Sequence, residues 1–265
     1  MSASTTTDAA IGLDIGGTGM KAALVSLRSG ERLTERRRVP TPPGGEPEQV
    51  VDAAVELLRQ VRRDAAPYSD DPDGLPLGVC LPAVVRRGVT RSAANISEAW
   101  IGLDAGARFA EALACPVSLV NDADAAGYAE VRFGAGREQR GTIMMITLGT
   151  GIGSALFHDH RLLPNTELGH LDIVPYEDFE RFASAKARKR RGMELDEWAS
   201  EWLTPYFRRL ERLFSPDLFI VAGGIIKRAE QFLPLVDAEA PVVPARLLND
   251  SGIAGAALLG AEGWR

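Results

Sequence analysis

A glycine-rich stretch near the start of the chain has the residue types and spacing of a phosphate site. Residues 13–21 read LDIGGTGMK and lie between a short apolar run and the apolar residues 22–25. This pattern predicts a strand, a tight glycine turn and a second strand. Gly16, Gly17 and Gly19 would let the backbone turn with φ > 0, and a turn without Cβ atoms can bring its N–H groups against an anion.

Three side chains distinguish this turn from a plain hairpin. Thr18 adds a hydroxyl donor, Lys21 a cation and Asp14 a carboxylate. A carboxylate beside a phosphate cradle indicates a bridging cation, for which magnesium is the usual choice, so Asp14 is the candidate metal ligand. A hairpin with a Gly-Gly turn is the alternative for this stretch taken alone. No helix-opening Gly-Lys-Ser/Thr follows, which excludes a Walker A loop.

Two further glycine turns follow predicted strands. The apolar residues 142–148 end on a Gly-Thr-Gly turn that leads into another strand, which indicates that the chain contains two related halves. The strand predicted at 217–221 is followed by Ala222 and a Gly-Gly pair, where a flat ring or a phosphate at a helix N-terminus would fit. An ordinary strand–helix connection is the alternative. The candidate residues are Gly149, Thr150 and Gly151 for phosphate, and Gly223 and Gly224 for a nucleotide.

Polar residues at other predicted strand ends and loops could hold a sugar. Asn121 and Asp122 follow a strand at 116–120 and precede a helix, which is where α/β enzymes hold ligands. Asp122 could cap that helix, but Asp124 offers a competing cap that would leave Asp122 for other work. The polar set that could bind several hydroxyls is Asn95, Asn121, Asp122, Glu167 and His170.

The elements that must position these residues alternate between strand and helix, which predicts an α/β fold, and the hairpin at the head of each half predicts mixed sheets. The 265 residues suffice for one large domain or two lobes. Besides the strands at the glycine turns, the pattern predicts a basic strand at 32–39, helices at 47–63, 104–114, 123–133, 177–191 and 195–214, a helix from the third glycine turn to about residue 236, and a small-residue helix at 251–262.

Composition excludes several classes of protein. The net charge of −6 argues against nucleic acid as the bulk partner. No apolar run approaches the roughly twenty residues of a membrane span, and residues 1–8 carry neither a basic region nor an apolar core, so no signal peptide is expected. The two cysteines, Cys80 and Cys115, show no pairing or metal-binding pattern, which suits a reducing cytoplasm.

Four motifs together resemble the ROK sugar kinases. They read DIGGT at 14–18, NDADAA at 121–126, LGTGIG at 148–153 and ELGH at 167–170. The resemblance extends from about residue 11 to residue 261. Within the family, AAN at 93–95, WIG at 100–102, NTE at 165–167 and PDLFI at 216–220 are similar to the actinobacterial polyphosphate glucokinases.

This resemblance implies a two-lobed actin/hexokinase-like (ribonuclease H-like) fold with duplicated mixed sheets and an interlobe cleft. The lobes would be residues 1–121, completed by a helix within 250–265, and residues 122–249. It implies a glucokinase that uses polyphosphate or ATP, with Asp122 as the catalytic base and magnesium as cofactor. A cytoplasmic homodimer is expected. Glucose would be bound by Asn95, Asn121, Asp122, Glu167, His170 and a further glutamate, Glu180.

The sequence departs from the family pattern in two informative places. The Cys-x-Cys-Gly zinc motif of many ROK proteins is absent after His170, so we expect no zinc and expect His170 to bind sugar. Pro82-Ala83 stands where the family has Pro-Gly, which bears on hexose preference. The alternatives are an ATP-dependent kinase for another hexose such as mannose, and a non-catalytic sugar sensor; the presence of Asp122 argues against the sensor, since a pure binder needs no base.

A basic run stands out in this acidic chain. It comprises Lys186, Arg188, Lys189, Arg190 and Arg191. A solvated helix face is the ordinary interpretation of such a run. The functional interpretation is a track for a long polyanion, because contacts that are individually weak add along a polymer.

Overall fold

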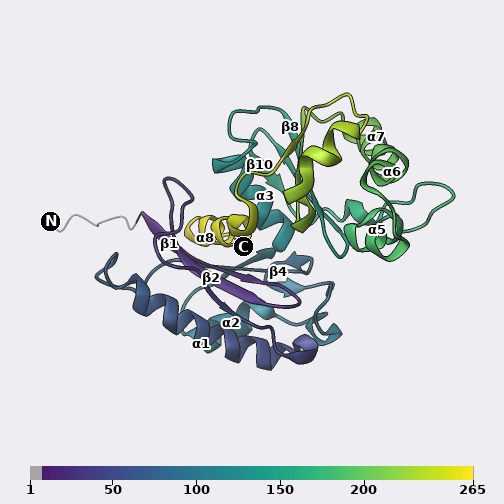
Figure 1. Cartoon of the computed structure of the whole chain (residues 1–265). Coiled ribbons are helices and arrows are strands. Elements are labelled where there is room, and N and C mark those ends of the chain that lie inside the picture. Colours follow the sequence, from purple (N-terminus) through teal and green to yellow (C-terminus); the bar gives the residue numbers. More distant parts are fainter. Residues whose placement is uncertain (1–7, 265) are drawn as a thin grey trace. The chain divides into compact units, whose positions relative to one another are not determined.

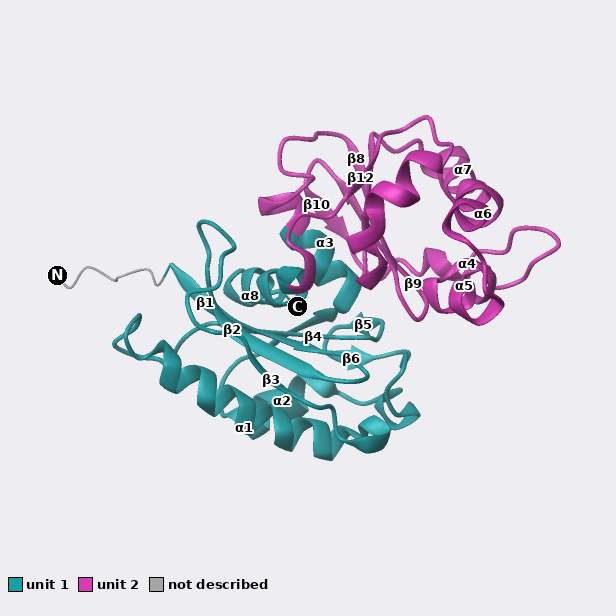
Figure 2. Ribbon diagram, in the orientation of Figure 1, with its two compact units in different colours: residues 1–129, 250–265 teal, residues 130–249 magenta. Residues whose placement is uncertain are grey.

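The computed structural model describes residues 8–264 (Figure 1). The chain forms two compact units: unit 1 comprises residues 1–129 and 250–265, and unit 2 comprises residues 130–249 (Figure 2). Most of the segment on which the expected lack of a signal peptide rests, residues 1–7, lies outside the described residues. Within residues 8–264 no helix is both long and apolar enough to cross a membrane.

Unit 1 is built on a five-stranded mixed sheet of order β3-β2-β1-β4-β7. β1 pairs antiparallel with β2 and parallel with β4, and β4 pairs parallel with β7, so β1, β4 and β7 end at the same edge. The strands are β1 (Ala9–Ile15), β2 (Met20–Ser26), β3 (Arg37–Val39), β4 (Leu77–Leu81) and β7 (Ser118–Asn121), and a separate hairpin consists of β5 (Val85–Arg86) and β6 (Val89–Thr90).

Helices cover both faces of this sheet. α1 (Pro47–Ala65) and α2 (Ala105–Leu113) lie on one face and α8 (Ser251–Ala261) on the other (Figure 2). α1 buries an apolar stripe spaced as a helix requires. α8 is buried from Ser251 through Leu259, which its small residues permit. α3 (Asp122–Phe133) begins in unit 1 and ends in unit 2.

The third strand of unit 1 is shorter than expected. The sequence predicts a strand at 32–39, but only Arg37–Val39 pairs continuously with β2, and Arg32 forms an isolated bridge. Between them the Thr34 hydroxyl accepts the N–H of Leu24 at 3.1 Å. A side chain thus replaces the backbone acceptor and interrupts the ladder.

Unit 2 repeats the sheet of unit 1. Its strand order is β10-β9-β8-β11-β12, with β8–β9 and β9–β10 antiparallel and β8–β11 and β11–β12 parallel. Each strand therefore has a counterpart in unit 1 with the same neighbours and directions, which confirms the predicted two related halves. The strands are β8 (Thr142–Leu148), β9 (Ile152–His158), β10 (Arg161–Leu163), β11 (Leu218–Ala222) and β12 (Val242–Pro244).

The helices of unit 2 differ from the prediction in two places. The single helix predicted at 177–191 breaks at Ser184, whose backbone is extended and whose hydroxyl caps the second piece by accepting the N–H of Ala187. The helix predicted after Gly224 is a 3-10 segment rather than an α-helix. The elements are α4 (Glu180–Ala183), α5 (Ala185–Arg191), α6 (Leu195–Trp198), a π-helical turn η4 (Ala199–Leu203), α7 (Thr204–Phe214), η5 (Gly224–Gln231) and η6 (Leu233–Leu235).

Candidate active site

The first glycine turn has the predicted strand–turn–strand form. Asp14 and Lys21 face each other across β1 and β2, and the Gly16 N–H donates to the Gly19 carbonyl at 3.0 Å. Thr18 lies at the exposed tip of the turn. The backbone and hydroxyl of this tip are therefore accessible to an anion.

The glycines of this turn are required for a different reason from the one predicted. None of Gly16, Gly17 and Gly19 has a positive φ, so that expectation is wrong. A Cβ on Gly17 would instead lie 2.5 Å from the carbonyl oxygen and 2.9 Å from the Cβ of Asn95. This candidate phosphate turn therefore packs directly on a candidate sugar residue of the same unit.

Asp14 lies at the base of the first glycine turn, between a lysine and a cysteine. Its Oδ2 lies 3.3 Å from Lys21 Nζ, and the Cys80 thiol donates to Oδ1 at 3.8 Å. The Asp14 side chain is 18% exposed, so it is held but reachable. Magnesium at phosphates is held by one or two carboxylates, waters and the phosphates themselves, and a single ordered carboxylate here fits that requirement.

Asn121 and Asp122 follow β7, as predicted, and Asp122 opens α3. The buried Asn121 amide oxygen accepts the N–H groups of Ala123 at 2.8 Å and Asp124 at 3.1 Å, and its Nδ2 donates to the Ala83 carbonyl at 3.2 Å. Asn121 therefore caps α3, a role that was not predicted from the sequence, and Asp122 Oδ1 also accepts the N–H of Ala123 at 2.8 Å. Asn121 fixes the position from which the half-buried Asp122 projects.

Asp14 and Asp122 share the carboxyl edge of the unit 1 sheet. Asp14 pairs in register with Cys80, which pairs with Val120, so Asp122 lies two strands away. With neighbouring strands about 4.8 Å apart, their backbones are separated by roughly 10 Å across the sheet. Burial raises the pKa of the Cys80 thiol, and the charges of Asp14 and Asp122 raise it further. The strand register therefore places the Asp14 and Asp122 backbones at the same edge of the sheet but two strands apart.

The second glycine turn in unit 2 repeats this arrangement. Gly149 N–H donates to the Gly151 carbonyl at 3.0 Å, and Thr150 is exposed. A Cβ on Gly151 would lie 2.4 Å from Glu180 Oε2, and the same oxygen accepts the N–H of Ile152 at 2.7 Å. This turn, too, is in direct contact with a candidate sugar residue.

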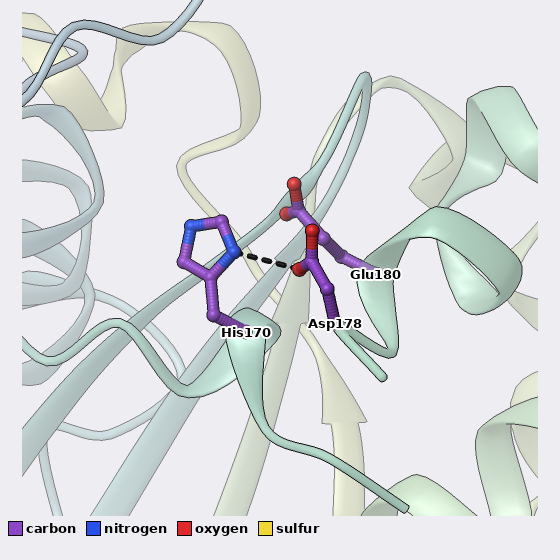
Figure 3. Close-up of side chains that lie close together, drawn as sticks. All are labelled: His170, Asp178 and Glu180. Atoms are coloured by element: carbon purple, nitrogen blue, oxygen red, sulfur yellow. Dashed lines mark hydrogen bonds and ion pairs between the residues drawn. The ribbon is translucent and has the colours of Figure 1, made fainter. Parts of the chain in front are cut away.

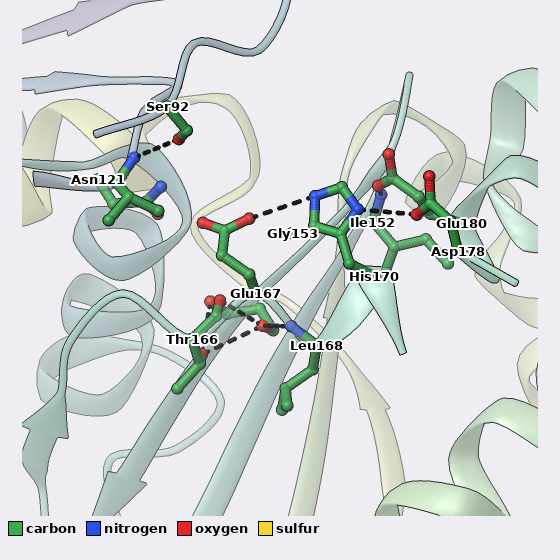
Figure 4. Close-up of polar contacts among 12 residues, drawn as sticks. Ser92, Asn121, Ile152, Gly153, Thr166, Glu167, Leu168, His170, Asp178 and Glu180 are labelled. Carbon is green, nitrogen blue, oxygen red and sulfur yellow. Dashed lines mark hydrogen bonds and ion pairs between the residues drawn. The ribbon is translucent and has the colours of Figure 1, made fainter. Parts of the chain in front are cut away.

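Glu167 and His170 lie beside one another around the short helix η3 (Leu168–His170) (Figure 4). His170 Nε2 is 3.7 Å from Glu167 Oε2, and His170 Nδ1 is 2.7 Å from Asp178 Oδ1. The Ser154 hydroxyl anchors the loop to β9 by accepting the N–H of Leu168 at 3.0 Å. Side-chain ligand atoms of His170, Asp178 and Glu180 lie within 4.8 Å of one another, close enough to hold a metal ion (Figure 3).

The pKa values of both His170 and Glu167 are raised in this cluster. The hydrogen bond with Asp178 raises the pKa of His170, and the negative charges of Glu180 and Glu167 add to the effect against partial burial. Burial raises the pKa of Glu167, although the nearby imidazolium opposes the shift. With its Nδ1 facing Asp178, His170 has its Nε2 edge available for a hydrogen bond with a ligand hydroxyl.

The third glycine turn packs against β8. Gly223 has a φ of 100°, and a Cβ there would lie 2.3 Å from the Leu148 carbonyl oxygen. Gly224 has no neighbour within 4 Å of where its Cβ would stand and begins η5. Gly224 is therefore the more open of the two candidate nucleotide residues.

The basic run forms α5, and its members differ in role. Arg188 turns inward and donates to the Met193 carbonyl at 2.8 Å, Arg190 donates to the Arg181 carbonyl at 2.9 Å, and Arg191 stacks 4.1 Å from the centre of the Trp202 ring. Lys186 and Lys189 are exposed, and no carboxylate of residues 8–264 pairs with either. The run is thus partly a structural element and partly a free cationic face.

The sequence model of the ROK family matches residues 10–181, more than half of the chain. The chain belongs to the ROK family. The matched segment includes the first two glycine turns, the Asn121–Asp122 pair and the Glu167–His170 loop.

Several ROK proteins are similar along nearly the whole chain. The polyphosphate glucokinase of Mycobacterium tuberculosis (strain CDC 1551 / Oshkosh) is 40% identical over 248 residues, which are 93% of this chain and 89% of that protein. The inorganic polyphosphate/ATP-glucomannokinase of Arthrobacter sp. strain KM, known from a crystal structure, is 47% identical in sequence. The two structures align with a TM-score of 0.88 over 96% of this chain and 98% of that chain. A ROK family glucokinase from Streptomyces griseus, solved in complex with glucose and AMPPNP, is 26% identical. It aligns with a TM-score of 0.78 over 95% of this chain and 98% of that chain. These neighbours have the actin/hexokinase-like fold, which confirms the predicted fold class.

Two residues of interest escape the sequence motifs of the ROK family. Asp178, which binds His170, lies in an irregular loop, and no spacing rule indicates it. Arg38 pairs in register with Lys21 and lies 3.2 Å from where a Gly19 Cβ would stand. Its neighbours Arg36 and Arg37 bind aspartates, whereas no carboxylate within the described residues pairs with Arg38. The Arg-Arg-Arg run at 36–38 was the only available signal for Arg38.

Proposed function

We propose that the chain is a polyphosphate-dependent glucokinase that transfers a phosphoryl group to the 6-hydroxyl of glucose. The observation that carries the proposal is similarity at 40% and 47% identity, over more than nine-tenths of the chain, to a polyphosphate glucokinase and a polyphosphate/ATP-glucomannokinase. The two glycine turns, the Asn-Asp pair and the Glu-Leu-Gly-His loop, which carry the resemblance to the family, support the proposal.

In this proposal Asp122 is the base that accepts the proton of the attacking hydroxyl. It is half-buried at a strand end, and the Asn121 cap holds the turn from which it projects. A positioned base contributes typically 10²–10⁴-fold. Positioning and charge neutralisation must supply the rest of the acceleration in phosphoryl transfer.

The donor phosphates are assigned to the two glycine turns and their cations. Unit 1 offers the exposed tip of its turn, Gly17 and Thr18, with Lys21 and Arg38 on the adjoining strands. Unit 2 offers the corresponding turn at 149–151. Magnesium at Asp14, when bound, would neutralise charge on the donor phosphates.

The candidate glucose ligands are polar residues of each unit. Unit 1 contributes Asn95 and Asp122, and unit 2 contributes Glu167, His170 and Glu180, the last three clustered by the contacts described above. Asn121 remains part of the proposed sugar site, although three of its hydrogen bonds are made within the protein. Cytoplasmic location and a homodimer stay predictions.

Mannose and ATP are a second acceptor and a second donor with a specific observation behind them. The 47% identical Arthrobacter enzyme is a glucomannokinase that is named for both polyphosphate and ATP. The free face formed by Lys186 and Lys189 favours a donor longer than ATP, because a long chain can reach cations beyond the phosphate turns.

The proposal is tested by a coupled assay on the purified protein that crosses polyphosphate and ATP with glucose, mannose and N-acetylmannosamine. We expect glucose 6-phosphate with polyphosphate as donor. Phosphorylation of no hexose by either donor would leave the sensor alternative, and activity with an amino sugar alone would refute the glucose assignment.

A further inference from the structure

We propose that Asp178 is a positioning residue of the sugar site, which holds the His170 imidazole in one tautomer and one ring orientation so that Nε2 faces the sugar. The inference rests on the proposed function, since it takes His170 as a sugar ligand. It adds a residue that no motif of the sequence contains.

The geometry of the pair fixes the tautomer. Asp178 Oδ1 lies 2.7 Å from His170 Nδ1, and an ionised carboxylate can only accept, so Nδ1 carries the proton (Figure 3). The opposite nitrogen, Nε2, points toward Glu167 at 3.7 Å (Figure 4). The side of the ring away from Asp178 is therefore the side that meets a second sugar residue.

Asp178 is itself held from several directions. Its backbone has a φ of 51°, its N–H donates to Asp172 Oδ1 at 2.8 Å, and its carbonyl accepts the N–H of Arg181 at 3.0 Å. The next residue, Phe179, is 1% exposed, and its N–H donates to the Leu171 carbonyl at 3.0 Å. A carboxylate on a loop tied in this way can orient another side chain, as outer partners of ligating histidines do.

A shared metal ion is the other arrangement that this cluster could support. Tetrahedral ligation at bond lengths near 2.1 Å would place the two ligand atoms about 3.4 Å apart. The observed 2.7 Å between Nδ1 and Oδ1 is a hydrogen-bond distance. The contact therefore favours direct pairing of His170 with Asp178.

The variants Asp178→Gly and Asp178→Asn separate the carboxylate from the backbone. Glycine and asparagine both tolerate the φ of 51°, so the loop can keep its path. Asp159→Asn is the matched control, because Asp159 also has a positive φ of 46° and lies 3.7 Å from a histidine, His158, outside the proposed site. We expect Asp178→Gly to raise the KM for glucose roughly tenfold and to leave the donor KM unchanged. Asp178→Asn should give a glucose KM between those of the parent and Asp178→Gly, and Asp159→Asn should match the parent.

A double-mutant cycle with His170→Gln asks whether Asp178 acts through the imidazole. If it does, Asp178→Gly adds nothing to the glucose KM in the His170→Gln background. Additive effects, or equal changes in donor and glucose KM, would overturn the inference. Retention of one zinc per chain after dialysis against EDTA, lost in Asp178→Gly, would overturn it in favour of a metal site.

Histidine NMR keeps the test independent of activity. The chain has 3 histidines, so a ¹⁵N-histidine spectrum is simple, and the His170 signals are those missing from His170→Gln. The parent should show protonated Nδ1, and Asp178→Gly should lose that preference and lower the His170 pKa toward its ordinary value. An Asp178→Gly spectrum identical to that of the parent would refute the pairing of Asp178 with His170. If the parent phosphorylates no hexose, the proposed function is refuted, and the spectrum still tests the pairing.

Discussion

Replacement of Gly151 by alanine tests whether the second phosphate turn and the sugar site are mechanically linked. The added Cβ would stand 2.4 Å from Glu180 Oε2, where ordinary contact begins near 3.4 Å. The carboxylate must therefore retreat by about 1 Å, and a displacement of that size at a reacting centre can cost on the order of 10²-fold.

The same retreat weakens a hydrogen bond that holds the turn. Glu180 Oε2 accepts the N–H of Ile152 at 2.7 Å, and an N–H left unpaired costs about 1–3 kcal/mol when it is buried. In a protein of this size 1 kcal/mol lowers Tm by about 2–4 °C. We expect kcat/KM for glucose to fall roughly 10–100-fold and Tm to fall by about 2–12 °C.

Gly149→Ala is the matched control in the same turn, because no atom lies within 4 Å of the position of its Cβ. It leaves Glu180 in place, so any effect should fall on the donor KM and not on the glucose KM. The assay is steady-state kinetics with glucose and donor varied separately, and circular dichroism for Tm. Equal kcat/KM values for glucose in the two variants would refute the linkage of Gly151 to Glu180.

Three further predictions concern the base, the cation and the donor. Asp122→Asn should lower kcat at least a hundredfold with glucose binding largely kept, as measured by kinetics and calorimetry; turnover within tenfold of the parent would exclude Asp122 as the base. After EDTA treatment magnesium alone should restore full activity, through Asp14, and a requirement for added zinc would contradict this. Lys186→Gln with Lys189→Gln should raise the KM for long polyphosphate several-fold and leave that for ATP unchanged, with added salt acting likewise, whereas Arg188→Gln should lower Tm because its guanidinium holds the Met193 carbonyl. Equal changes in the KM for polyphosphate and for ATP in the lysine double variant would contradict a polyphosphate-binding role for Lys186 and Lys189.

The sequence predicts well those parts of the site that consist of neighbouring residues. Both strand–turn–strand units and the Asn121–Asp122 strand end are local patterns, and the structure has them where they were expected. The family motifs lie on the same local units, so the fold class followed from them. Tertiary contacts decided the rest: Ser184 breaks a helix that propensity would continue, and Thr34 interrupts a strand.

Asp178 illustrates what local patterns cannot supply. It lies in a loop tied by Asp172 and by buried Phe179, and only that folded path brings its carboxylate to His170. An Asp in a polar loop has many ordinary roles, and helix and strand periods say nothing about contacts across the irregular segment that separates Asp178 from His170. The partner becomes visible only when the loop has a conformation.

The glycines of the turns were predicted at the right positions but for the wrong structural reason. The sequence predicted that Gly17 would supply a positive φ, but its hydrogen faces Asn95, and the hydrogen of Gly151 faces Glu180 in the same way. Both neighbours come from distant parts of the chain, so backbone freedom and close approach cannot be told apart from the motif alone. The structural reason changes what mutagenesis measures: any side chain at Gly17 or Gly151 displaces a candidate sugar residue as well as the phosphate turn. Kinetic effects at these two positions should therefore appear in both substrates, and Gly149, which has open space, is the position that reports on the donor alone.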